Sequence, residues 1–168
     1  RLREDSPGVS LSVSATTRPP RAGEVDGIHY FFVDDQEFDR LIADGELLEW
    51  ATVHNAHRYG TPRKPVEDAL AAGRTVLLEI DIQGALQVRA AEPSAALVFL
   101  LPPSWDELVD RLVGRGTEDE EERRRRLRTA VTELKGQDVF DFRVINDDVA
   151  RAAQEVVELA QAPARREA

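Results

Sequence analysis

The sequence contains no cysteine, and only two of its 168 residues are lysine. Without cysteine, neither disulfide bonds nor thiolate-bound zinc can form. Its apolar runs are all shorter than the roughly 20 residues that a membrane-spanning helix needs, and no signal peptide is visible. The net charge of −10 argues against nonspecific binding to nucleic acid or to an anionic membrane. We therefore expect a cytoplasmic protein whose partners are small molecules, and its oligomeric state stays open.

The hydrophobic content of 42% and the chain length predict a single domain with a substantial core. Two short, nearly continuous apolar runs, residues 75–80 and 97–101, are typical of buried parallel strands. A helix over about 84–91 is expected between them, so the three elements predict a βαβ unit and an α/β sheet. Asp81 directly follows the first of these strands, at the end where open α/β sheets place their ligands.

The residues that precede this unit predict a smaller region of mixed helix and strand. Short apolar patterns predict strands over 9–13, 30–33 and 47–53. Asp34 or Asp35 can cap a helix between the second and third of these strands, and Gly45 closes it. Residues 62–72 predict another helix, which Gly73 ends.

The C-terminal part of the sequence predicts helices around one more strand. A capping box that begins at Ser104 opens a helix with Trp105 on its core face. A second capping box begins at Thr117. Residues 143–145 predict the last strand, and an amphipathic helix that includes Val149 follows it.

Two arginines near the N-terminus, Arg18 and Arg21, are the first candidate site residues. Their planar guanidinium groups suit the oxygens of a phosphate dianion. Tyr30 and Tyr59 can add neutral hydroxyl donors. Considered alone, two arginines beside a pair of prolines could also form a solvated turn, because surface charges are usually solvated.

A carboxylate can recognise guanine, because the pairing edge of this base presents adjacent N1–H and N2–H donors that adenine lacks. Glu49 is the candidate carboxylate, and Ser14 and Thr61 are candidates for contacting guanine O6. An isolated glutamate in an alternating strand would by default face solvent. Together with the arginines and tyrosines, however, this set favours a site for guanosine monophosphate (GMP).

From about Ser10 to Asp148 the sequence resembles guanylate kinase. The resemblance begins with the motif residues between 14 and 61. The further matching blocks are residues 79–84, 102–104, 111–118, 126–127 and 144–148. Five separate blocks in one order are not expected by chance.

The resemblance implies the P-loop nucleoside monophosphate kinase fold, an α/β domain with a parallel sheet core and helices on both faces. It divides the single domain, residues 1–168, into three parts: a core (1–14, 73–104 and 136–162), a small mixed α+β GMP-binding subdomain (15–72) and a helical lid region (105–135). It also implies transfer of the γ-phosphoryl group of ATP to GMP, and to dGMP, with Mg²⁺, which yields ADP and GDP.

The same resemblance assigns the candidate residues to three groups. The phosphate of GMP is held by Arg18, Arg21, Tyr30 and Tyr59, and its base by Ser14, Glu49, Thr61 and Asp81. The catalytic group consists of Arg111, Arg115 and Arg126, which would stabilise charge on the transferred phosphate. Asn146 would border the adenine of ATP.

The ATP-binding loop of this family, with the pattern G-x-x-x-x-G-K-[ST], does not occur in the sequence. Lys64 follows Gly60 without a second glycine, so we expect it to be a surface charge. Because the sequence begins at Arg1 and contains no methionine, we expect the gene to begin upstream and to encode the loop there. The sequence given should then bind GMP without transferring phosphate.

Two alternatives to a GMP kinase remain. A noncatalytic module of the same family would keep the monophosphate pocket and bind GMP or a phosphorylated partner, but it would lose the lid arginines, which are present. A kinase acting on a sugar phosphate would not need a guanine reader. We therefore expect an ATP:GMP phosphotransferase of purine nucleotide metabolism.

Overall fold

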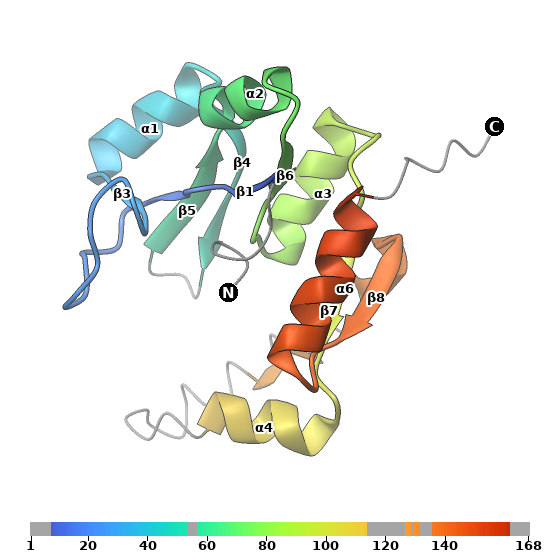
Figure 1. Ribbon diagram of the computed structural model, residues 1–168. Helices are drawn as coiled ribbons and strands as arrows, with labels where there is room; N and C mark the ends of the chain where they lie inside the picture. Colours follow the sequence, from blue (N-terminus) through green and yellow to red (C-terminus); the bar gives the residue numbers. More distant parts are fainter. Residues whose placement is uncertain (1–7, 54–56, 114–126, 129, 132–135, 162–168) are drawn as a thin grey trace. The chain divides into compact units, whose positions relative to one another are not determined.

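The computed structural model describes residues 8–53, 57–113, 127–128, 130–131 and 136–161. They fall into two units, Arg1–Ala95 and Ala96–Ala168, and each unit is described by itself. Figure 1 labels the helices and strands. Within the described residues, no helix is long and apolar enough to cross a membrane. The division into core, GMP-binding subdomain and lid stays a prediction.

A four-stranded sheet forms the centre of the first unit (Figure 1). Its strands, in spatial order, are β3 (Phe31–Phe32), β2 (Ala15–Thr16), β5 (His57–Pro62) and β4 (Leu47–Val53). The β2 strand runs parallel to β3 and antiparallel to β5, and β5 is antiparallel to β4. The strand predicted over 47–53 is confirmed in full, and the strand predicted over 30–33 is confirmed at its centre.

The sequence pattern does not predict β5, because Gly60 and Pro62 both disfavour strands. The structure gives the reason for the glycine. A Cβ atom at Gly60 would lie 2.9 Å from the carbonyl oxygen of Glu49 and 3.0 Å from Leu47 Cδ1. Only glycine therefore lets β5 approach β4 this closely.

The helix α1 (Asp35–Ala43) forms as its capping signals predict. The Asp34 carboxylate accepts a hydrogen bond of 2.8 Å from the backbone N–H of Glu37. After the helix, Gly45 has a φ of +67°, a conformation that favours glycine. Phe38 is fully buried and anchors the apolar face of α1 against the sheet.

The side chain of Arg58, a residue of β5, connects the sheet to α1. Its guanidinium group donates hydrogen bonds to the carboxylates of Asp35 and Asp39, and its central carbon lies 4.7 Å from the centroid of the Phe38 ring. The side chain is only 18% exposed. The charge-assisted bonds and the cation–π contact should therefore both stabilise the packing of the helix on the sheet.

We expect Arg58→Met to lower the free energy of unfolding by about 1–2 kcal/mol. The substitution removes a partly buried guanidinium, and with it the hydrogen bonds to two carboxylates and the cation–π contact. Arg40→Met is the matched control, since Arg40 also binds carboxylates beside α1 but is exposed. The control should leave the stability nearly unchanged, because exposed ion pairs contribute little. Chemical denaturation measures both variants, and equal losses would contradict the argument from burial.

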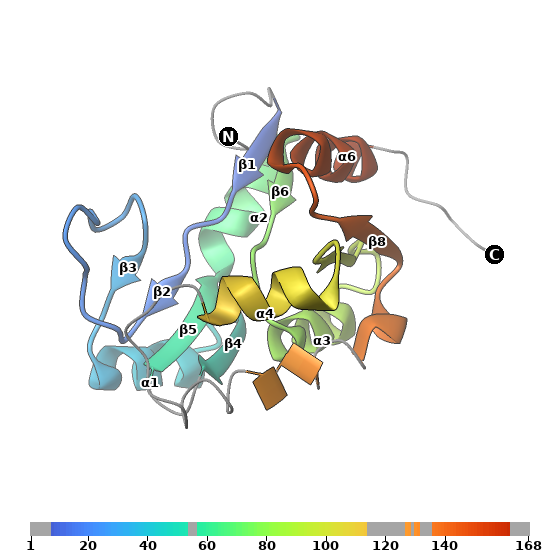
Figure 2. The same ribbon diagram turned by 90° about the horizontal axis from the view of Figure 1, so that it is seen from below.

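This unit contains a second ladder, whose two strands precede and follow the helix α2 (Arg63–Ala71) in the sequence. It pairs β1 (Val9–Leu11) in parallel with β6 (Thr75–Leu77). The strand predicted over 9–13 is confirmed over Val9–Leu11, and the separate short strand β2 follows it and enters the four-stranded sheet; Figure 2 shows both along one stretch of chain. The strand predicted over 75–80 ends early, at Leu77.

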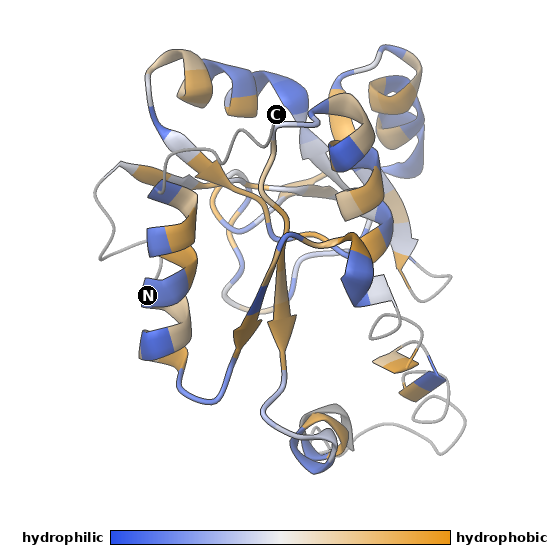
Figure 3. Ribbon diagram, turned by 90° about the vertical axis from the view of Figure 1, so that its right-hand side faces the viewer, coloured by the Kyte–Doolittle hydropathy of each residue, from blue (hydrophilic) through white to orange (hydrophobic). Residues whose placement is uncertain are grey.

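The second unit contains a parallel pair of strands, β7 (Val98–Leu101) and β8 (Phe142–Ile145). Both strands are largely hydrophobic, as Figure 3 shows. Its other elements are α4 (Trp105–Val113), the short 3₁₀ helix η1 (Gly136–Val139) and α6 (Val149–Gln161). The capping interaction predicted for Ser104 is confirmed, because its hydroxyl accepts a hydrogen bond of 3.1 Å from the N–H of Glu107.

Some predictions for packing in these elements are wrong. Trp105 is 47% exposed and Val149 is 65% exposed, so neither is a core residue of its helix as described. The buried positions of α6 are Ala152 and Val156. The strands β6 and β7 belong to different units, so the βαβ unit predicted from residues 75–80 and 97–101 stays a prediction. The capping box at Thr117 lies outside the described residues.

Candidate functional site

Arg18 is held in one orientation at the end of β2. The residue is 8% exposed. Its Nη2 donates to Glu24 Oε1 over 2.8 Å, and its Nη1 donates to the carbonyl oxygen of Pro19 over 2.7 Å. The guanidinium carbon lies 5.3 Å from the centroid of the Tyr30 ring. Since a guanidinium has five N–H groups, further donors remain for a phosphate.

Glu24 holds both arginines of this loop. Its second carboxylate oxygen accepts a hydrogen bond of 2.7 Å from the backbone N–H of Arg21, whose side chain is exposed. The hydrogen bond from Arg18 lowers the pKa of the Glu24 carboxyl, and the Arg21 N–H lowers it further. Sequence reasoning missed Glu24, although a carboxylate so close in sequence to two arginines was a usable signal.

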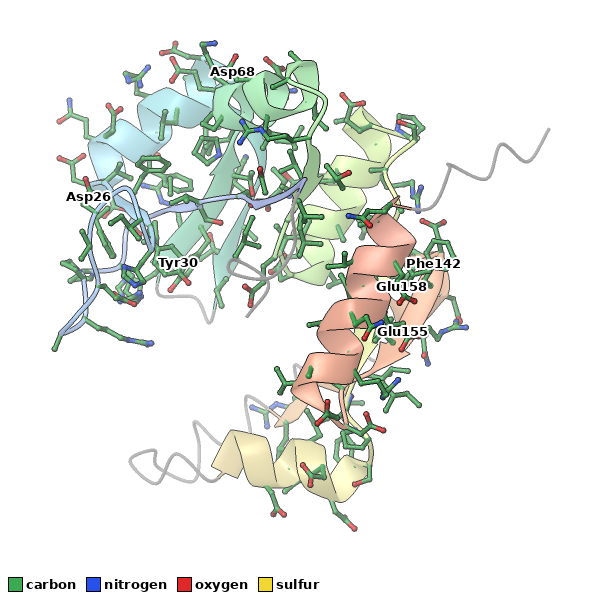
Figure 4. All side chains as sticks on the ribbon, viewed as in Figure 1. Asp26, Tyr30, Asp68, Phe142, Glu155 and Glu158 are labelled. Carbon is green, nitrogen blue, oxygen red and sulfur yellow. The ribbon has the colours of Figure 1, made fainter. Side chains whose placement is uncertain are left out.

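The two tyrosines predicted to bind phosphate pack against each other. The ring centroids of Tyr30 and Tyr59 are 6.0 Å apart, with an interplanar angle of 68°. Tyr30 follows a tight loop in which the Asp26 carboxylate accepts a hydrogen bond of 2.9 Å from the N–H of Phe32; Figure 4 labels Asp26 and Tyr30. A hydrogen bond with Tyr59 contributes to the raised pKa of Arg18, after the larger effect of Glu24. The structure thus brings Arg18 and both tyrosines together.

Glu49 and Thr61 form a buried pair across β4 and β5. Glu49 is 5% exposed and Thr61 is fully buried. The Thr61 hydroxyl donates to Glu49 Oε1 over 2.6 Å. The two residues lie directly opposite each other in the antiparallel ladder. Among the described residues, no arginine or lysine forms an ion pair with this carboxylate.

Burial raises the pKa of the Glu49 carboxyl above its usual range. The hydrogen bonds from Thr61 act in the opposite direction, and the negative charge of Asp81 adds to the rise. A buried carboxylate with a hydroxyl as its side-chain partner still has lone pairs for further donors. This is the property that a reader of N1–H and N2–H requires.

The β5 strand carries both a residue predicted to bind the phosphate, Tyr59, and a residue predicted to bind the base, Thr61. Tyr59 and Thr61 are two positions apart, so their side chains point to the same face of the sheet, about 7 Å from each other along the strand. Ser14 immediately precedes β2, and its carbonyl oxygen accepts the N–H of Phe31 over 2.9 Å. The contact of its hydroxyl with a base stays a prediction.

Asp81 has a structural role that the sequence analysis did not assign. It is the N-cap of the helix α3 (Ile82–Ala91), where its Oδ1 accepts a hydrogen bond of 2.9 Å from the N–H of Gly84. This cap explains why α3 begins earlier than the predicted 84–91. The effect of Asp81 on the pKa of Glu49 places the two carboxylates near each other, but a contact of Asp81 with a nucleotide stays a prediction.

The remaining candidates belong to the second unit. Arg111 lies in α4, whereas Arg115 and Arg126 lie outside the described residues. Asn146 directly follows β8, and its backbone N–H donates to the carbonyl oxygen of Leu101 over 2.7 Å. Their predicted roles in catalysis and in ATP binding are not tested by these positions.

Comparisons with known proteins give the same family for the chain. The guanylate kinase family profile matches residues 2–162. A guanylate kinase from Leifsonia xyli subsp. xyli is 67% identical over 94% of this chain and 62% of its own length. A guanylate kinase from Thermobifida fusca is 59% identical over 96% of this chain and 82% of its own length. The chain therefore spans less than two thirds of the first relative and most of the second.

A solved structure supports the fold. The crystal structure of guanylate kinase from Anaplasma phagocytophilum matches with a TM-score of 0.78 and 34% sequence identity, and the match covers 95% of this chain and 78% of that chain. The predicted α/β fold of the P-loop nucleoside monophosphate kinases is thus confirmed. With a profile match across nearly its whole length, the chain belongs to the guanylate kinase family.

Proposed function

We propose that this chain provides the GMP-binding site of an ATP:GMP phosphotransferase that yields ADP and GDP. The observation that carries the proposal is the buried Glu49–Thr61 pair, because an ionisable carboxylate is costly to bury unless it serves a donor. Guanine offers two adjacent donors on one edge. The nearby tyrosine on the same strand, Tyr59, then meets the phosphate end of the nucleotide with Arg18, Arg21 and Tyr30.

In this proposal the protein acts by positioning and by neutralising charge. An oxygen of the GMP phosphate forms a bond to the γ-phosphorus of ATP, and the bond between that phosphorus and the β–γ bridging oxygen breaks. Arg18 and Arg21 fix the accepting phosphate, while Ser14, Glu49, Thr61 and Asp81 seat the base. Arg111, Arg115 and Arg126 stabilise charge on the transferred group when the lid closes, and Asn146 borders adenine.

The proposal also includes Mg²⁺. Among the described residues, no group of three or more histidine, cysteine, aspartate or glutamate side chains could hold a metal ion. The described part of the chain therefore does not form a metal cage of its own. Mg²⁺ commonly binds nucleotide phosphates and keeps several waters, so we propose that it accompanies ATP. A cytoplasmic location and the use of dGMP likewise remain proposals.

A series of nucleoside monophosphates tests this function. We expect binding in the order GMP and dGMP, then inosine monophosphate (IMP), which lacks the N2 amino group, then AMP. Leaving one buried acceptor unmatched should weaken IMP relative to GMP by about tenfold or more. Calorimetry measures the dissociation constants, and ADP release with ATP measures transfer in a chain extended by a P-loop segment. Equal affinity for GMP and AMP would contradict the proposal, and GMP binding without ADP release would favour the noncatalytic module.

A further inference from the structure

The helix α3 approaches the Glu49 side chain at Gly84. A Cβ atom at Gly84 would clash with Glu49 Oε2 and would lie 3.0 Å from its Cδ and 3.2 Å from the Cβ of Ile80. Gly84 lies inside the helix, with no positive φ, so backbone conformation does not demand glycine here. The carboxylate of Glu49 occupies the space that a side chain at position 84 would fill.

One turn later, Gln87 binds the backbone beside Glu49. Its Oε1 accepts a hydrogen bond of 3.1 Å from the N–H of Trp50, and its Nε2 donates one of 2.7 Å to the Trp50 carbonyl oxygen. In the part of the chain that the structure describes, β4 is at the edge of its sheet, so no strand there pairs with the outward backbone groups of Trp50. The side-chain amide of Gln87 forms the two hydrogen bonds that a neighbouring strand would otherwise form with Trp50.

Gly84 and Gln87 are three positions apart, so they lie on one face of α3. Figure 1 shows α3 running beside β4, and the contacts between these two elements are extensive. One residue leaves room for the carboxylate, and the other fixes the backbone from which the carboxylate extends. The first contact is with the Glu49 side chain and the second is with the backbone of the next residue, Trp50, and both come from the same helix.

We propose that Gly84 and Gln87 are positioning residues that hold the Glu49 carboxylate and thereby set the preference for guanine over other purines. The proposal rests on the function proposed above, in which Glu49 accepts hydrogen bonds from the base. Neither residue needs to touch the nucleotide. Their measurable effect is the ratio of the dissociation constants for IMP and GMP, called the base preference below.

Gln87→Met keeps the length of the side chain and removes both hydrogen bonds to Trp50. We expect the base preference to fall by about three- to tenfold, because the reader is held less firmly, with little change in the affinity for AMP. Gln87→Glu keeps only the acceptor, so its base preference should lie between that of Gln87→Met and that of the wild type. Gln154→Met is the matched control, since Gln154 is an exposed glutamine of α6 that bonds to Glu158 (Figure 4 labels Glu158). An unchanged base preference in Gln87→Met would overturn the role of Gln87.

Gly84→Ala tests the steric half of the proposal. Alanine is the better helix former, so without a clash the midpoint of thermal unfolding should rise. We expect it to fall instead, and the base preference to fall about tenfold or more, because the new methyl group displaces the carboxylate. In the background of Glu49→Ala the same change should raise the midpoint, since the two nearest obstructing atoms, both of Glu49, are gone and only Ile80 Cβ at 3.2 Å remains. Equal shifts of the midpoint in both backgrounds would overturn the role of Gly84.

The outcomes separate this inference from the proposed function. If Glu49→Ala leaves the base preference unchanged, the proposed function fails and the inference fails with it. If Glu49→Ala abolishes the preference while Gly84→Ala and Gln87→Met keep it, only the positioning role is wrong. Calorimetry with GMP, IMP and AMP on the 168-residue chain gives the base preference of each variant and its affinity for AMP.

Discussion

Replacing Glu49 by alanine should weaken GMP binding by about 1–3 kcal/mol, which is roughly tenfold to more than a hundredfold in the dissociation constant. The reason is that N1–H and N2–H of guanine would enter a buried site without an acceptor. IMP should lose less, because it presents only N1–H. AMP should bind equally well or slightly better, since its N1 is an acceptor that the carboxylate repels. Calorimetry with the three nucleotides measures the difference.

Glu46→Ala is the control for this change. Glu46 lies just before β4, is exposed, and pairs with Arg40. Its removal should leave the affinities for all three nucleotides unchanged. If Glu49→Ala weakened GMP and AMP by the same factor, the base-reading role would be excluded and a general loss of structure would explain the result.

Replacing Arg18 by methionine should weaken GMP binding by about 2–4 kcal/mol, or roughly thirty- to a thousandfold. Methionine keeps an apolar side chain against Tyr30 but removes the charge that faces the phosphate, and it leaves the Glu24 carboxylate without its guanidinium partner. The affinity of Arg18→Lys for GMP should lie between those of the wild type and Arg18→Met, because lysine keeps the charge without the planar arrangement of donors. Isothermal titration with GMP gives the dissociation constants.

Guanosine provides the internal control for Arg18. It carries the same base without a phosphate, so its weak binding should be the same in the wild type and in Arg18→Met. A parallel loss of guanosine binding would mean that the loop had collapsed rather than that a phosphate ligand had been removed. An unchanged affinity for GMP would remove Arg18 from the phosphate site.

Local signals predict the parts of the fold in which one residue decides the outcome. Asp34 caps α1 and Gly45 ends its last turn, and both are visible as single residues in the sequence. The β5 strand could not be found in this way. Its Gly60 is required by the carbonyl of Glu49 on the neighbouring strand, and no local pattern contains information about that contact. Pairing between distant segments decided the strand against its own propensity.

The candidate site shows the same division. The chemistry that a nucleotide demands led to the prediction of Glu49, Thr61, Arg18 and both tyrosines, and the structure places Glu49 beside Thr61 and Arg18 beside Tyr30. Glu24 was missed although it lies close in sequence to both arginines, whereas Gln87 bonds to a residue 37 positions away and becomes visible as a partner only once the chain is folded. Asp81 was predicted to follow a strand directly, but β6 ends at Leu77, and Asp81 instead caps α3 by accepting a hydrogen bond from the Gly84 N–H.

The buried Glu49 carboxylate has a cost for folding. Because its pKa is higher in the folded chain than in the unfolded chain, ionisation favours the unfolded chain, and this loss of stability persists at any pH above the folded pKa. It disappears only as the pH falls toward the ordinary value of a glutamate. A sequence optimised for thermal stability alone would therefore tend to replace Glu49 by a neutral residue. If Glu49 binds guanine as proposed, selection for a robust fold and selection for the nucleotide demand opposite side chains at position 49.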